Sequence, residues 1–130
     1  MAQARKTQKT EQSVNEFLET ITDPVRQSDA IAMVAMMKEV TATEPRMWGG
    51  SLVGFGDDQY LSANGKSNDW FRLGFSPRKS SVTIYGMGRY QGDELSVLGK
   101  HELSGGCLHI KSLADVDLNI LKTILGKLWA

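Results

Sequence analysis

The chain has 130 residues, which is enough for one domain with a single hydrophobic core. Its 15 Lys and Arg residues balance 15 Asp and Glu residues, and this zero net charge argues against a generally basic nucleic-acid-binding protein and against a highly charged disordered chain. One cysteine precludes an internal disulfide bond, and no apolar run reaches the roughly 20 residues of a membrane span. Residues 1–12 are polar and lack the apolar stretch of a secretory signal, so we expect a disordered tail before a single domain at residues 13–130. We therefore expect a cytoplasmic protein with neither a nucleic-acid nor a membrane partner.

Charge and glycine are both distributed unevenly along the chain. Residues 13–45 hold six acidic and two basic residues, whereas residues 46–100 hold seven basic and five acidic ones. The first 48 residues contain no glycine, and 12 of the 13 glycines lie between Gly49 and Gly106. Glycine is unfavourable inside helices and frequent in turns and bulges. This order predicts helices first, then strands and turns, then a final helix, as in an α+β fold.

The N-terminal part of the domain carries helix signals. Ser13 and Glu16 have the spacing of a capping box, in which both side chains satisfy backbone N–H groups at the start of a helix. Asp23 and Pro24 predict the end of this helix and the start of a second one, which we expect to run to about Val40. The second helix contains the segment AIAMVAMM, which is apolar on nearly all sides, so it should be deeply buried.

The middle of the chain favours antiparallel strands. Alternation and turn signals predict them at residues 47–56, 59–62, 69–75, 82–87 and 107–111. Asn64 and Gly65 are typical of a tight hairpin, because both tolerate positive φ. A short helix at residues 93–98 and a last helix that begins at or just before Asp115 complete the prediction. We expect an α+β fold in which two N-terminal helices and one C-terminal helix cover one face of a curved antiparallel sheet of about five strands.

Alternation also assigns side chains to the two faces of this sheet. The face toward the helices should hold Phe71, Leu73, Phe75, Val82, Ile84, Leu108 and Ile110. The opposite face should hold Trp70, Arg72, Tyr85, Met87, His109 and Lys111. Two interpretations of the second face stay open. In the first, the face is solvated, or is covered by a helix or by the second subunit of a homodimer. In the second, it is a binding surface for a small molecule or peptide. In the second case the ligand surface comprises Trp70, Arg72, Tyr85 and His109.

One group of acidic side chains has a spacing compatible with metal binding. Glu16, Glu19 and Asp23 fall at i, i+3 and i+7, on one side of the first predicted helix. Such a row of carboxylates can hold a hard cation such as Ca²⁺, or iron. The alternative is a solvated helix face with a capping role. Cys107 and His109 share a strand face, but two ligands do not complete a structural zinc site.

Three basic side chains are candidates for anion binding. Arg78 and Lys79 follow Pro77 at a predicted hairpin tip, and Lys100 precedes a glycine-rich loop whose N–H groups can join an anion site. No Walker or G-x-G-x-x-G loop occurs. Motifs of the G-x-S-x-G, H-E-x-x-H and C-x-x-C types are also missing from the sequence, so we expect a binding protein rather than an enzyme.

Five stretches of the sequence, taken in order, carry a family resemblance. They are residues 13–17 (SVNEF), 44–56 (EPRMWGGSLVGFG), 69–79 (DWFRLGFSPRK), 98–101 (LGKH) and 107–117 (CLHIKSLADVD). Together they resemble the YdhG-like bacterial domains, a family described as a domain of unknown function. The resemblance runs from about residue 13 to the C-terminus, and it implies a compact cytoplasmic α+β domain. Because these domains have been grouped with frataxin-like iron chaperones, it also implies a small binding module that handles iron.

The sequence departs from the pattern of this family in two places. His109 stands where an aromatic Tyr is usual, which adds a potential metal ligand. Residues 102–106 (ELSGG) lack the usual additional Lys, which weakens an anion site at that loop. The resemblance identifies no catalytic residues.

Overall fold

A computed structural model of the chain describes residues 13–61, 65–87, 90–104 and 106–129. Its helices are α1 (Val14–Glu19), α2 (Pro24–Thr41), α3 (Leu95–Leu98) and α4 (Leu118–Trp129), with a 3-10 turn, η2 (Leu113–Asp115). Its strands are β1 (Pro45–Trp48), β2 (Leu52–Phe55), β3 (Asp58–Leu61), β4 (Ser67–Trp70), β5 (Leu73–Pro77), β6 (Val82–Tyr85), β7 (Glu102–Ser104) and β8 (Cys107–Ile110). The predicted tail at residues 1–12 and the turn residue Asn64 lie outside the described residues.

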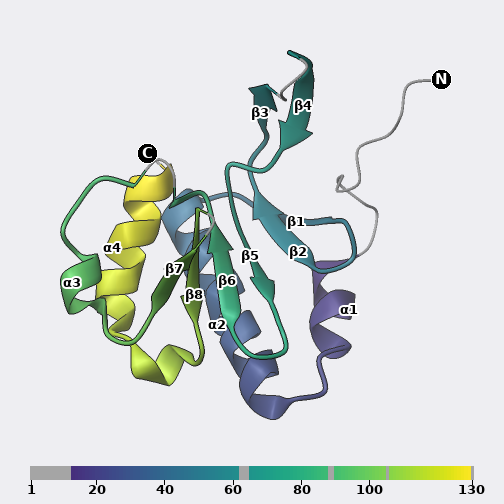
Figure 1. The fold of residues 1–130 in the computed structure, drawn as a ribbon. Coiled ribbons are helices and arrows are strands. Elements are labelled where there is room, and N and C mark those ends of the chain that lie inside the picture. Colours follow the sequence, from purple (N-terminus) through teal and green to yellow (C-terminus); the bar gives the residue numbers. More distant parts are fainter. Residues whose placement is uncertain (1–12, 62–64, 88–89, 105, 130) are drawn as a thin grey trace.

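The strands form two antiparallel sheets. Six strands pair in the order β1-β2-β5-β6-β8-β7, and β3 pairs only with β4 within the described part of the chain. The β3–β4 hairpin projects beyond the end of the larger sheet (Figure 1). The expected α+β class with an antiparallel sheet, N-terminal helices and a C-terminal helix is confirmed.

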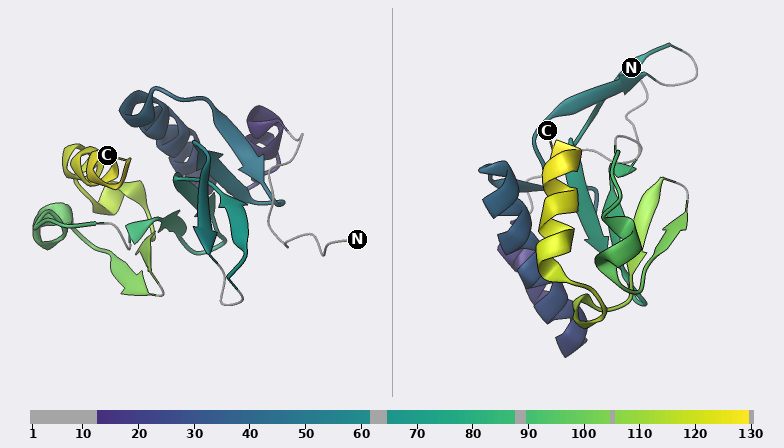
Figure 2. Two further views of the ribbon diagram at one scale, coloured as in Figure 1. Left: turned by 90° about the horizontal axis from the view of Figure 1, so that it is seen from above. Right: turned by 90° about the vertical axis from the view of Figure 1, so that its left-hand side faces the viewer.

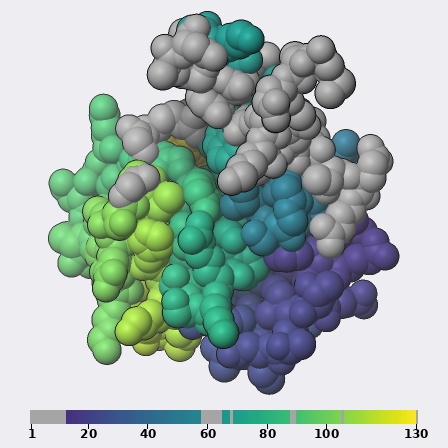
Figure 3. All heavy atoms as spheres, turned by 45° about the vertical axis from the view of Figure 1, so that its right-hand side comes forward, coloured from purple at the N-terminus to yellow at the C-terminus, as the bar shows by residue number. Residues whose placement is uncertain are grey.

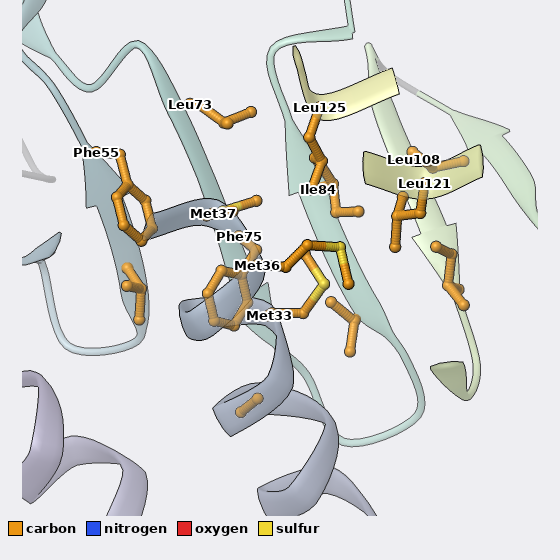
Figure 4. Close-up of a cluster of buried hydrophobic side chains, with 14 of the residues drawn as sticks. Met33, Met36, Met37, Phe55, Leu73, Phe75, Ile84, Leu108, Leu121 and Leu125 are labelled. Atoms are coloured by element: carbon orange, nitrogen blue, oxygen red, sulfur yellow. The ribbon is translucent and has the colours of Figure 1, made fainter. Parts of the chain in front are cut away.

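The core lies between the large sheet and two helices. Figure 2 shows α2 and α4 side by side on one face of the sheet, while α1 packs against α2 and β1. The central methionines of α2 meet strand side chains below α4 (Figure 4). This cluster includes Met33, Met36, Met37, Phe55, Leu73, Phe75, Ile84, Leu108, Leu121 and Leu125. Burial of a side chain of this size stabilises a fold by about 1.5–3 kcal/mol, so this layer dominates stability.

Local signals explain the N-terminal helices. The Ser13 hydroxyl accepts a hydrogen bond from the backbone N–H of Glu16 at 3.4 Å, as the capping box predicts. The Asp23 carboxylate accepts from the backbone N–H of Val25 at 2.9 Å, and proline follows at the first helical position. The predicted starts of both helices are confirmed, and α2 ends at Thr41, one residue beyond the expected Val40. Helix α1 ends at Glu19, several residues before Asp23, where the sequence predicts its end.

Two segments that the alternation predicts as single strands are interrupted. Residues 47–56 form β1 and β2, because the chain reverses at residues 49–51, where Gly49 has φ 65°. Residues 69–75 contain the end of β4 and most of β5, separated by a bend at Phe71 and Arg72. Alternation places side chains only within an unbroken strand, so Phe71 is not on the helix-covered face where we expected it.

The C-terminal region differs from the prediction in its details. Asp115 belongs to the turn η2, and the cap of α4 is Asp117, whose carboxylate accepts from the backbone N–H of Asn119 at 2.9 Å. Strand β7 was not predicted, because its three exposed residues are too few to show a period.

Candidate ligand-binding face

The face of the large sheet that points away from α2 and α4, here called the outer face, carries the aromatic and polar side chains of the strands. Tyr85 pairs with Gly74 on one side and with Cys107 on the other, and Thr83 pairs with His109. Directly paired residues share a face, so Tyr85 and His109 lie on the same one. Figure 3 shows this side of the molecule, with the β5–β6 hairpin between the blue surface of β1 and β2 and the yellow-green surface of β8.

Four aromatic rings form a cluster on the outer face. The Trp70 ring stacks on Phe71 with centroids 4.2 Å apart. Trp48 meets Trp70 and Phe71 edge-on, at 6.0 and 5.7 Å, and Tyr85 meets Phe71 edge-on at 5.9 Å. Such pairs contribute about 0.5–1.5 kcal/mol beyond the burial of their area. Trp48 and Phe71 are only 1% and 2% exposed, whereas Trp70 and Tyr85 are half-buried and reach the surface.

Two glycines make room for this cluster. Gly54 and Gly74 are partners across β2 and β5. A Cβ atom at Gly74 would lie 2.6 Å from Cε1 of Phe71, and one at Gly54 would lie 2.6 Å from Nε1 of Trp48. The rings therefore occupy the space that side chains on these strands would take. A glycine in each of two neighbouring strands is therefore the sequence signal that could have indicated aromatic rings packed over this part of the sheet.

A groove of about 660 Å³ opens beside the aromatic cluster, and we call it the basic groove. It is lined by Ser51, Leu52, Trp70, Ser76, Pro77, Arg78, Lys79 and Tyr85. Arg78 donates a hydrogen bond from Nη2 to the Tyr85 hydroxyl at 2.7 Å. Among the described residues, no carboxylate forms an ion pair with Arg78 or Lys79, and none lines the groove. The groove therefore combines two aromatic side chains with two positive charges that no described carboxylate pairs with.

The hairpin turn that carries these cations is held from the helix side of the sheet. Arg26 of α2 donates from Nε to the backbone carbonyl of Lys79 at 3.3 Å, and its Nη1 donates to the backbone carbonyl of Lys111. Asp29, one turn further along α2, lies 3.8 Å from Arg26 and accepts from the backbone N–H of Leu113 at 3.1 Å. One guanidinium group thus fixes both the β5–β6 turn and the end of β8.

A second depression lies on the other side of this turn, and we call it the polar hollow. It measures about 520 Å³ and is lined by Ser80, Ser81, Lys100, His101, Glu102, Ser104, His109, Lys111 and Asp115. Lys100 lies here, whereas the other two predicted anion-binding residues line the basic groove. His109 also lines the hollow, and its Nδ1 is 3.1 Å from the Thr83 hydroxyl. The structure therefore divides the predicted site residues between two places.

Arg72 is turned away from both depressions. Its Nε donates a hydrogen bond to the backbone carbonyl of Trp129 at 2.7 Å, and its guanidinium lies 5.8 Å from the centre of the Trp129 ring. Alternation places Arg72 beside Trp70, but the bend between β4 and β5 directs it to the end of α4 instead. Arg72 therefore supports the base of the β3–β4 hairpin and does not line the basic groove.

The predicted carboxylate row lies on and after α1. Glu16 and Glu19 are exposed, and Asp23 is engaged as the cap of α2. Within the part of the chain that the structure describes, no three His, Cys, Asp or Glu side chains are grouped closely enough to share a metal ion. Burial raises the pKa of the Cys107 thiol, and the positive charge of Arg78 only partly opposes this, so the thiol is mainly protonated at neutral pH.

Comparison of the chain with protein-family models, curated proteins and solved structures finds no match. None of the described helices combines the length and the apolar character that crossing a bilayer requires. Function is therefore inferred from the geometry of the outer face.

Proposed function

We propose that the protein is a cytoplasmic binding module of the YdhG-like type whose ligand site is the basic groove. Its ligand is a small anion that carries a flat apolar group. This proposal is supported by one observation: Arg78 and Lys79 line the same groove as Trp70 and Tyr85, and no described carboxylate lines it.

The charges select an anion. Arg78 presents a planar guanidinium, which can donate two parallel hydrogen bonds to a carboxylate or phosphate. Its hydrogen bond to the Tyr85 hydroxyl uses one Nη and orients the group over the groove. Lys79 adds a second charge from the next position in the turn, and Arg26 holds the backbone of that position from below.

The aromatic side chains select the rest of the ligand. Trp70 and Tyr85 both pack on Phe71, so their positions are fixed before a ligand arrives. Fixed rings lower the entropic cost of binding and favour stacked or edge-on contact with a flat group. A volume of about 660 Å³ is within the range of small-molecule sites, which favours a compact ligand over a protein partner.

Calorimetric titration with three probe compounds tests this proposal. We expect 2-naphthoate to bind, while the neutral 2-naphthalenemethanol and the small anion acetate each bind at least about tenfold more weakly, a difference of about 1.4 kcal/mol. Lys79→Gln should weaken naphthoate binding by a similar factor. Lys122→Gln removes the same charge from α4, where Lys122 pairs with Glu39, and should leave affinity unchanged. Equal binding of the acid and the alcohol, or equal losses in both variants, would contradict the proposal.

The family resemblance leads to a separate prediction, which is that the protein binds iron. Glu16 and Glu19 are the exposed carboxylates that would contribute to it. Anaerobic titration with Fe²⁺ should then give binding at low micromolar affinity or better, and the paired Glu16→Gln and Glu19→Gln changes should weaken it. If the intact protein binds no iron, this prediction is wrong, and the proposal for the basic groove is unaffected.

A further inference from the structure

The polar hollow is assembled from segments that are distant in the sequence. An isolated bridge pairs Gly99 with Val116, and the backbone N–H of Lys100 donates to the carbonyl of Asp115 at 3.3 Å. Gly99 has φ 118°, and a Cβ atom there would lie 2.3 Å from the Asp115 carbonyl oxygen, so only glycine fits this crossing. On the opposite wall, Arg26 holds the backbone carbonyl of Lys111. The walls of the hollow are therefore fixed by backbone contacts that do not involve its functional side chains.

The charges that line the hollow are mixed. Lys100 and Lys111 supply two positive charges, and Glu102 and Asp115 supply two negative ones. None of the four forms an ion pair with a described residue, so each keeps its capacity to bind a ligand group. A bare anion would be attracted by the lysines and repelled by the carboxylates. A ligand that carries both an anionic group and hydroxyl groups can bind the lysines through the anion and donate hydrogen bonds to the carboxylates through the hydroxyls.

The uncharged groups of the hollow fit such a ligand. Nδ1 of His101 lies 2.8 Å from the Gly99 carbonyl oxygen, so Nδ1 is the donor in this contact, and Nε2 is left to form a hydrogen bond with a hydroxyl. Nδ1 of His109 is engaged with Thr83, which leaves Nε2 to face the hollow. The lining also includes the hydroxyls of Ser80, Ser81 and Ser104. Hydroxyl groups can donate to a phosphate oxygen or accept from a polyol.

From this arrangement we infer that the polar hollow is a second binding site, for a phosphorylated polyol such as a sugar phosphate. The phosphate lies between Lys100 and Lys111, and the polyol hydroxyls donate to Glu102 and Asp115. Among the residues that the structure describes, the hollow and the basic groove share none in their linings, so this inference does not depend on the proposed function.

An NMR titration of the full chain with glucose 6-phosphate tests this inference, with glucose and inorganic phosphate as comparison probes. We expect saturable shifts of the backbone amides of Ser104 and Lys111, with the sugar phosphate binding at least about tenfold more tightly than either comparison probe. Failure of glucose 6-phosphate to shift these amides would overturn the site. Inorganic phosphate binding as tightly would overturn the polyol assignment, and shifts confined to Trp70 and Tyr85 would show that the compound occupies the basic groove instead.

Two matched variants separate specific binding from general charge effects. Lys100 and Lys111 are exposed, and the contact of Arg26 is with a backbone carbonyl, so Lys100→Gln combined with Lys111→Gln leaves the walls intact. This double variant should weaken glucose 6-phosphate binding at least tenfold. Lys38→Gln combined with Lys122→Gln removes the same charge from α2 and α4, where both lysines form exposed ion pairs, and an equal loss in that variant would overturn the inference.

Discussion

Replacing Gly74 by Ala tests whether Phe71 fills the outer face. The new Cβ atom would lie 2.6 Å from Cε1 of Phe71 and 2.8 Å from the backbone oxygen of Val53, and both distances are shorter than a normal van der Waals contact. The ring and the strand must therefore shift by several tenths of an ångström. Overpacking of this kind costs about 1–3 kcal/mol, whereas a Gly-to-Ala change without a clash stabilises a protein by about 0.4–1 kcal/mol.

A double-mutant cycle with Phe71→Ala assigns this cost to the ring. Phe71→Ala alone should reduce the free energy of unfolding by about 3–5 kcal/mol, because the ring is buried. Urea unfolding should show that Gly74→Ala costs at least about 1 kcal/mol less in this background, since the two contacts with the ring, at 2.6 and 2.7 Å, are then removed. Gly50→Ala is the matched control, because a Cβ atom there would have no atom of a described residue within 4 Å. Costs that add to within about 0.5 kcal/mol would refute the placement of Phe71 against Gly74.

Three further predictions concern stability and are read from urea unfolding. Gly56 has φ 76°, and a Cβ atom there would lie 2.6 Å from the Trp129 ring. Gly56→Ala should therefore destabilise the protein by more than about 1 kcal/mol. An unchanged midpoint of unfolding would show that Trp129 does not cover this turn. Gly126 lies within α4, and no atom elsewhere in the described part of the chain is within 4 Å of a new Cβ atom there. Gly126→Ala should therefore stabilise the protein by about 0.5–1 kcal/mol, and a loss of stability would contradict the helix. The pKa of Glu94 is lowered from 4.5 to about 2, mainly by a hydrogen bond from Lys127 and to a smaller extent by one from the Tyr90 hydroxyl. The ionised Glu94 thus stabilises the fold above pH 4.5, and this contribution is lost as the pH falls toward 2. Glu94→Gln should therefore lose less stability over that interval than the wild type, and parallel pH profiles would contradict this ion pair.

The helical part of the fold could be predicted because its signals are local. Asp23 and Pro24 act on adjacent backbone groups, and the structure uses both as the sequence indicates. The division of residues 47–56 into two strands was also signalled locally, by Gly49 and Gly50, but alternation on both sides concealed the turn. Strand β7 could not be found, because it is defined by pairing with β8 and not by its own pattern.

The candidate sites could be predicted only in part. Tyr85 and His109 lie in unbroken strands, so alternation places them on one face. Phe71 and Arg72 lie at a bend, and a single irregular residue reverses the assignment of faces. Lys100 and His109 line the same hollow because a backbone bridge joins Gly99 to Val116. A single long-range bridge of this kind produces no periodic pattern in the sequence, so it could not be predicted.

The position of a bound aromatic anion tests the central claim most directly. Intermolecular NOEs between 2-naphthoate and the protein should connect its ring protons to the side chains of Trp70 and Tyr85 in the basic groove. A second groove, between α1 and α2, is lined in part by Ile31 and Val34. NOEs to Ile31 and Val34, with none to Trp70 and Tyr85, would contradict the account.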